Sequence, residues 1–192
     1  LPVNENHPDR PVTVYDVHKL TSENYLKHYV REGVVRGGIL RLANVYGPGP
    51  ESSSADRGVL NQMIRKALNH ETLTVHGEGN FIRDYLYVKD AAKAFLDAAM
   101  NIDKLNGRHF VIGSGQGITV AQAFHLVAER VEKKTGHKSV ITHIDPPNHL
   151  SPIEYRNFVA DSRLFSSLTD WKAQTDLVEG IDFTIDSYLQ VR

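Results

Sequence analysis

ILRLANVYGPGP, at residues 39–50, is the stretch of sequence that says most about the fold. Its first eight residues are largely apolar, and a short apolar run of this length predicts a buried β-strand. The glycines and prolines at 47–50 cannot continue the strand and predict a wide loop at its end. Residues near this loop can therefore face a ligand.

A helix is predicted on the N-terminal side of this strand. Thr13 can cap the helix with Asp16 at its third position, close to a capping box, and helix-compatible residues continue to about Glu32. Residues 1–11 contain polar side chains and three prolines without a periodic apolar face, so they are expected to form a loop. The chain opens on Leu1 rather than Met, and we expect it to begin inside a longer protein.

Strands and helices are expected to alternate on the C-terminal side as well. The expected strands lie at 72–77, 85–88, 109–112, 140–144 and 157–161. The expected helices lie at 59–68, at 91–100 with Asp90 as cap, from Thr119 with Gln122 completing a capping box, and at 178–189. This alternation predicts an α/β layered fold.

Composition limits the kinds of partner. A net charge of −1 gives no broad field for nucleic acid or an anionic membrane, so a small molecule is the expected ligand. No apolar run approaches 18 residues, which favours a cytoplasmic protein without a spanning helix. There is no cysteine, and the ten histidines lack the spacing of a metal site, so no metal is expected.

A Tyr-x-x-x-Lys pair occupies Tyr15 to Lys19 in the predicted first helix. Residues four apart lie on one helix face, so the phenol and the ammonium should stack there. A nearby ammonium favours phenolate, which would equip the phenol for general-base catalysis near neutral pH. By itself the pair is more typical of a solvated helix surface, and its context decides between the two interpretations.

That context is an ordered set of motifs. The Tyr-x-x-x-Lys pair is followed by RLANVYGP at 41–48, GEGNFIRDYLYV at 77–88, HFVIGSG at 109–115 and TDWKAQTDLVEGIDFTI at 169–185. In this order they resemble the extended short-chain dehydrogenase/reductase family of NAD-dependent nucleotide-sugar epimerases and dehydratases. The resemblance covers nearly the whole chain.

The resemblance implies a catalytic and cofactor-binding set. Tyr15 would take the proton of a sugar hydroxyl while NAD accepts a hydride from the same carbon. Lys19 would support the Tyr15 phenolate and hydrogen-bond the nicotinamide ribose. Ala43 would lie against the cofactor.

It also implies a site for a nucleotide-diphosphate sugar. Asn44, Arg83 and, by a weaker match, Arg156 would reach the diphosphate, as the forked donors of arginine permit. His76 would stack beside the nucleobase and Leu60 would line the same pocket. Each residue also has a structural interpretation: Asn44 as a turn residue, Arg83 in an ion pair with Asp84 or another neighbour, and His76 and Leu60 in ordinary packing.

The implied fold is the C-terminal part of a Rossmann-type doubly wound parallel sheet plus a small α/β substrate-binding lobe. Residues 1–50 would belong to the NAD-binding domain, and residues 51–192 mainly to the lobe, with some return to the Rossmann sheet. The Gly-rich cofactor loop and a catalytic Ser or Thr would lie upstream. Residues 113–117 place glycines at alternate positions, but Ile118 stands where a dinucleotide-binding loop needs its third glycine, so a simple strand-to-helix turn is predicted.

Epimerisation through a transient keto-sugar is the expected activity of the whole enzyme, which should be a homodimer. A nucleotide-sugar 4,6-dehydratase is the alternative within the family. A non-catalytic NAD-binding regulator of the same fold and a purely structural sugar-nucleotide-binding module are the alternatives of other classes. These residues alone are expected to be inactive, because they lack the loop that cradles the NAD pyrophosphate.

Overall fold

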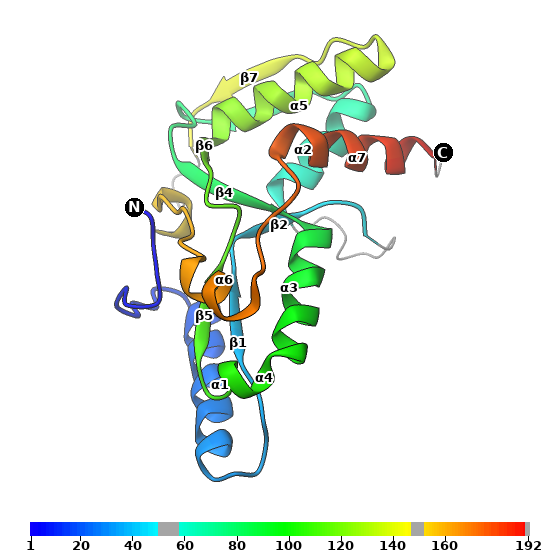
Figure 1. The fold of residues 1–192 in the computed structure, drawn as a ribbon. Helices are drawn as coiled ribbons and strands as arrows, with labels where there is room; N and C mark the ends of the chain where they lie inside the picture. The colour runs from blue at the N-terminus through cyan, green and yellow to red at the C-terminus, as the bar shows by residue number, and fades with distance from the viewer. Residues whose placement is uncertain (50–57, 147–151, 191–192) are drawn as a thin grey trace.

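The computed structural model describes residues 1–49, 58–146 and 152–190 (Figure 1). Its elements in chain order are α1 (Val14–Arg31), β1 (Ile39–Leu42), β2 (Asn44–Tyr46), α2 (Val59–Leu68), β3 (Leu73–His76), β4 (Ile82–Tyr87), α3 (Val88–Met100), α4 (Ile102–Leu105), β5 (His109–Ile112), β6 (Gly117–Thr119), α5 (Val120–Thr135), β7 (Ile141–Ile144), the 3-10 helix η1 (Pro152–Tyr155), α6 (Arg163–Thr169) and α7 (Leu177–Gln190). Strands and helices alternate along the chain, so the predicted α/β class is confirmed. The predicted boundary between residues 50 and 51 lies outside the described residues.

The elements form two lobes, which lie at the bottom and the top of Figure 1. The lower lobe contains α1, β1, β5, α3, α4 and α6, and β1 pairs in parallel with β5. The upper lobe contains α2, β3, β7, α5 and α7, and β3 pairs in parallel with β7. A three-stranded sheet in the order β2-β4-β6 lies between them, parallel between β2 and β4 and antiparallel between β4 and β6.

Each lobe has its own hydrophobic core, and β4 contributes to both. Side chains of successive strand residues point to opposite faces. Tyr85 and Tyr87 accordingly lie in the upper core with Leu60 and Phe124, whereas Leu86 lies in the lower core with Ala43, Phe110, Phe165 and Trp171. Leu86 is completely buried, which is worth about 1.5–3 kcal/mol for a side chain of its size. The middle sheet therefore ties the two cores together.

The single strand predicted at residues 39–46 is two strands. Ile39 to Leu42 pair with β5, whereas Asn44 to Tyr46 pair with β4, so the chain changes partner at Ala43. Both pairings are parallel, and each partner is distant in sequence. Local composition shows an apolar run but cannot show that its two halves belong to different sheets.

The predicted start of α3 is also wrong. Its N-cap is Tyr87 and its first residue is Val88, which the sequence placed in a strand. Asp90 lies in the first turn, buried, and its carboxylate accepts a hydrogen bond from the Thr175 backbone at 3.0 Å. An aspartate that was expected to cap its own helix instead holds the segment before α7.

The strand predicted at 157–161 is reduced to one bridge between Ala160 and Val3. Both predicted capping boxes are confirmed, with Thr13 and Asp16 starting α1 and Thr119 and Gln122 starting α5. These motifs depend only on residues three apart, which is why the sequence located them correctly.

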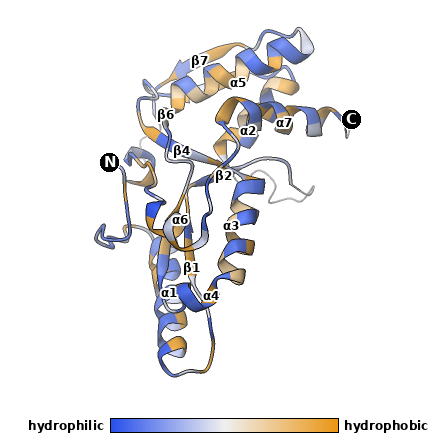
Figure 2. Ribbon diagram, viewed as in Figure 1, coloured by the Kyte–Doolittle hydropathy of each residue, from blue (hydrophilic) through white to orange (hydrophobic). Residues whose placement is uncertain are grey.

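Helix α1 is attached to the lower lobe mainly through charges. None of its residues is buried, and Figure 2 shows hydrophilic and hydrophobic residues along its length. Arg41 on β1 donates to Glu23 of α1 at 2.8 Å and to Asp9 at 2.7 Å. The hydrogen bond from Arg41 holds the pKa of Asp9 below its usual value, although partial burial opposes this. The arginine thus fastens both the helix and the N-terminal loop to β1.

Candidate active site

Tyr15 and Lys19 lie together on an open face of α1. The Lys19 ammonium is 5.4 Å from the centre of the Tyr15 ring, and Tyr15 is 65% exposed. Among the residues that the structure describes, neither the phenol hydroxyl nor the ammonium has a hydrogen-bond partner. The two side chains share one helix face, as the i,i+4 spacing predicted.

Ala43 and Asn44 stand at the junction of β1 and β2. The Ala43 backbone N–H donates to Ile112 of β5 at 2.7 Å, and its side chain is buried. Asn44 is exposed and is in register with Tyr85 of β4. Adjacent strand residues point in opposite directions, so the methyl group enters the lower core while the amide faces solvent.

Arg83 holds the backbone of the segment that contains Glu154 and Arg156. The residue is 8% exposed in β4, and its guanidinium donates to the backbone carbonyl of Arg156 and, at 2.9 Å, to that of Glu154. The ion pair that the sequence allowed with Asp84 is formed with Glu154 instead, with 3.8 Å between the charged atoms. A buried guanidinium with carbonyl partners fixes η1 and the residues after it.

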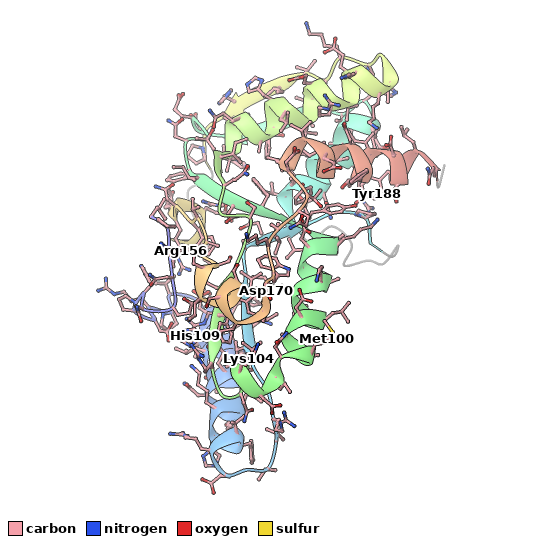
Figure 3. All side chains as sticks on the ribbon, in the orientation of Figure 1. Met100, Lys104, His109, Arg156, Asp170 and Tyr188 are labelled. Atoms are coloured by element: carbon pink, nitrogen blue, oxygen red, sulfur yellow. The ribbon has the colours of Figure 1, made fainter. Side chains whose placement is uncertain are left out.

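Arg156 reaches the N-terminus of α1. Its Nη2 donates to Asp16 Oδ2 at 3.1 Å, and Figure 3 shows Arg156 just beyond η1. The same oxygen accepts the backbone N–H groups of Val12 at 3.1 Å and Thr13 at 3.2 Å. Partial burial raises the Asp16 pKa, but these hydrogen bonds outweigh it and leave the pKa below its usual value. An ionised Asp16 therefore connects the segment after η1 to the helix of Tyr15 and Lys19.

Asp84 is a buried residue that sequence reasoning did not select. Its carboxylate accepts a hydrogen bond from the Ser114 hydroxyl at 2.6 Å. It also accepts hydrogen bonds from the backbone N–H groups of Ser114, Gly115 and Ala160, at 2.9, 3.0 and 3.0 Å. A buried charge needs such compensation. The signal was present in the adjacent charges of Arg83 and Asp84 within an otherwise apolar strand.

These bonds also determine what the turn at 113–117 can do. In a phosphate-binding loop the backbone N–H groups point at the ligand, but here Asp84 takes those of Ser114 and Gly115. The predicted strand-to-helix turn is wrong in this respect, because the turn leads into β6 before α5 begins. The prediction that it is not a dinucleotide-binding loop agrees with this arrangement.

His76 and Leu60 belong to the upper lobe. His76 is exposed at the end of β3 in register with Ile144 of β7, and Leu60 is 1% exposed in the upper core. The placement of Leu60 matches its packing interpretation, and its role in lining a substrate pocket stays a prediction. Among the helices in the described part of the chain, none combines the length and apolar character needed to cross a membrane.

A family model described as "NAD dependent epimerase/dehydratase family" matches residues 2–113, more than half of the chain. The chain belongs to this family. The match contains Tyr15, Lys19, Ala43, Asn44 and the Arg83–Asp84 pair, so the family resemblance predicted from the ordered motifs is confirmed.

Similar proteins agree with this membership. A protein of Methanocaldococcus jannaschii, provisionally named as a UDP-glucose 4-epimerase, is 32% identical over 94% of this chain and 55% of its own length. The structure of Thermotoga maritima UDP-glucose 4-epimerase with UDP-glucose is 29% identical, with a TM-score of 0.81 over 95% of this chain and 55% of that one. Thermus thermophilus UDP-glucose 4-epimerase in complex with NAD is 25% identical, with a TM-score of 0.80 over 100% and 59%. The fold is thus that of Rossmann-type epimerases, and the chain spans about half the length of these relatives.

Within this epimerase/dehydratase fold, two groups of predicted site residues are each brought together. Tyr15 and Lys19 form one, and Arg83 and Arg156 form the other, joined to α1 through Asp16. The sequence identified Asp16 only as the partner of Thr13 in the capping box. Its contact with Arg156 spans 140 residues, and no local pattern carries that information.

Proposed function

We propose that this chain is the portion of an NAD-dependent nucleotide-sugar epimerase that supplies the catalytic base and most of the sugar-nucleotide site. The observation that carries the proposal is the Tyr15–Lys19 pair, exposed on α1 with the ammonium 5.4 Å from the ring centre. In this reading Tyr15 takes the proton of a sugar hydroxyl as the carbon becomes a ketone, and returns it when the ketone is reduced. Lys19 stabilises the phenolate through its charge.

The residues fit a nicotinamide cofactor on chemical grounds. The Lys19 ammonium offers three donors, none of which has a hydrogen-bond partner in the described ranges, and these suit ribose hydroxyls. Ala43 turns its methyl group into the lower core, so only its backbone would lie against the cofactor. NAD, when bound, accepts and returns the hydride. The turn at 113–117 does not cradle its pyrophosphate, because Asp84 occupies the N–H groups there, and we propose that a Gly-rich loop beyond this chain does so.

The proposed substrate is a nucleotide-diphosphate sugar. Arg156 is suited to the diphosphate because its side chain is 45% exposed and only Nη2 has a described partner. Both terminal nitrogens of Arg83 donate to backbone carbonyl groups, so Arg83 would act chiefly by holding the Arg156 backbone. Its Nε has no partner among the described residues and would be the atom that contacts the diphosphate directly. Asn44 would donate its exposed amide to the diphosphate. His76 and Leu60 are retained as proposed neighbours of the nucleobase.

A 4,6-dehydratase is the second candidate, favoured by the family's own description, which names both reactions. It would use the same Tyr15–Lys19 pair and differ in residues outside this chain. A non-catalytic regulator or a purely structural binding module would have no use for an exposed phenol–ammonium pair. We further propose a homodimer formed in part by helix-on-helix contacts of α1, and a cytoplasmic location stays a prediction from composition.

The test is turnover of UDP-glucose by the full-length protein with NAD. An epimerase yields a product of unchanged mass that separates chromatographically, whereas a dehydratase yields one lighter by a molecule of water. Tight binding of UDP-glucose without either product would favour the regulator or the binding module. Failure to bind UDP-glucose, dTDP-glucose or NAD would overturn the proposal.

A further inference from the structure

The segment that carries Arg156 is held firmly by its backbone. Besides the two carbonyls bonded to Arg83, Asn157 accepts the Ile82 backbone N–H at 2.8 Å and Phe158 donates to the Ile82 carbonyl at 3.0 Å. These bonds fix the segment from Glu154 to Phe158 on β4 without involving the Arg156 side chain. The guanidinium can therefore change partners while its backbone stays in place.

The partner that the guanidinium has in this structure is an anion. Asp16 is ionised, and its Oδ2 lies 3.1 Å from Arg156 Nη2, a charge-assisted hydrogen bond of the kind that a phosphate oxygen also accepts. Arg156 is 45% exposed and Asp16 19% exposed, so the pair is open to solvent and to ligands. A contact of this kind is weak enough to be exchanged.

We propose that the Asp16 carboxylate is paired with the Arg156 guanidinium in the absence of substrate. The substrate diphosphate must then displace this carboxylate in order to bind the guanidinium. Asp16 is then a positioning residue that lowers the affinity of the site, acting through Arg156 and not on the sugar. This inference rests on the proposed function, because it needs a diphosphate ligand.

Displacement of Asp16 from Arg156 would also affect α1, the helix that carries Tyr15 and Lys19. Asp16 Oδ2 accepts the Val12 and Thr13 N–H groups as well as Arg156, so loss of the arginine leaves the carboxylate bonded only to the cap of α1. Asp16 immediately follows Tyr15, so arrival of the diphosphate changes the charge balance beside the base. The substrate thereby loosens a connection between the Arg156 segment and the helix that carries out the proton transfer.

The experiment uses Asp16→Asn in the full-length protein, with UDP as probe and uridine as control. The asparagine oxygen can still accept the Val12 and Thr13 N–H groups, so the helix cap survives while the charge is lost. UDP should bind about 2- to 5-fold more tightly, the factor that corresponds to losing an exposed ion pair. Uridine affinity, measured by the same calorimetry, should not change.

Two further variants separate this role from general effects. Asp16→Glu keeps both the charge and the capping box, so its UDP affinity should return to that of the wild type. In an Arg156→Met background, Asp16→Asn should no longer alter UDP affinity. Tighter binding that persists without Arg156 would show a long-range charge effect and overturn the proposal.

The remaining outcomes distinguish the two levels of inference. If the wild type binds UDP but Asp16→Asn leaves its affinity unchanged or weaker, Asp16 is only a helix cap, and the proposed function is unaffected. If the wild type binds neither UDP nor dTDP, the proposed function fails and the displacement model fails with it.

Discussion

Tyr15 is one of several exposed tyrosines on α1, and only its spacing from Lys19 distinguishes it. Tyr25 is 62% exposed on the same helix, compared with 65% for Tyr15. Exposure alone would not tell the two apart. The nearby ammonium of Lys19, over the Tyr15 ring, is what marks Tyr15 as the proposed base.

Tyr15→Phe should reduce kcat on UDP-glucose by about 10²- to 10⁴-fold, the range for loss of a general acid–base group. Affinity for the nucleotide sugar should stay within about 2-fold, because the ring and its packing are retained. Steady-state kinetics and calorimetry measure the two quantities. Tyr25→Phe is the matched control and should leave both unchanged. Equal losses of binding and rate in Tyr15→Phe would indicate a packing role.

Arg83 is expected to matter for stability as well as for binding. Arg83→Met removes the donors to the Glu154 and Arg156 carbonyls, which should lower the free energy of unfolding by about 1–3 kcal/mol. UDP affinity should also fall, because Arg156 loses its backbone anchor, while uridine affinity should change less. Urea unfolding and calorimetry provide the measurements.

Arg163→Met is the control for this substitution. The Arg163 side chain is 87% exposed, and among the described residues it pairs only with Asp161 two residues away, so its removal should cost little. If uridine and UDP affinities fall equally in Arg83→Met, Arg83 supports the fold or the nucleobase pocket rather than the phosphate end of the site.

At the scale of elements, α5 and α7 are joined by charged pairs on consecutive turns. Arg130 donates to Asp182 at 2.8 Å, and Lys134 pairs with Asp186 one turn further along both helices. The hydrogen bond from Arg130 keeps the Asp182 pKa below its usual value, against the opposing effect of burial. The pairs are partly buried between helices that also share the upper core.

Asp182→Asn should lower the free energy of unfolding by about 1 kcal/mol at pH 7. Because the folded-state pKa of Asp182 is depressed, its stabilisation is present above the unfolded value near 4 and is lost as pH falls through the folded value. The difference from wild type should therefore shrink below about pH 4 in urea unfolding. In an Arg130→Met background the substitution should cost nothing further, and a constant difference down to pH 3 would contradict the assignment.

The correct predictions at this scale are those that depend on contacts between residues close in sequence. Thr13 with Asp16 and Thr119 with Gln122 were located correctly because a capping box is complete within four residues. Tyr15 and Lys19 were paired correctly for the same reason. The break at Ala43 was missed because it depends on which distant strand pairs with each half of the run.

The arginine site shows the same limit. The sequence identified Arg83 and Arg156 through a family resemblance, but not their contact, which spans 73 residues. Asp84 was missed because its importance lies in closing the turn at 113–117 and the Ala160 segment, neither of which is near it in the chain. Residue type suggested the chemistry, and only tertiary structure shows which donors remain free.

At the scale of the whole molecule, α1 leaves several apolar side chains exposed. It has no buried residue, and apart from the proposed base its exposed apolar side chains include Val14, Val17, Tyr25 and Tyr29. Surfaces of this kind are usually covered by a partner. The relatives are nearly twice as long as this chain, so residues beyond those matched here are available in them to provide the cover.

Residues 1–192 produced alone should therefore associate or aggregate, whereas the same residues in the full-length protein should stay dispersed. Light scattering at several concentrations measures this directly. Charged substitutions at Val14 and Val17 should improve the solubility of the isolated residues. A cooperatively unfolding monomer of 21.5 kDa would show instead that these residues form an autonomous domain.

The alternation of side chains along β4 couples the unfolding of the two lobes. Tyr85 and Tyr87 belong to one core and Leu86 to the other, so the strand cannot leave either lobe without disrupting the one that remains. Amide hydrogens of β4 can then exchange with solvent only when both lobes open together, and they should be among the slowest in the molecule. The cooperative unit of unfolding thus crosses the visible division into lobes.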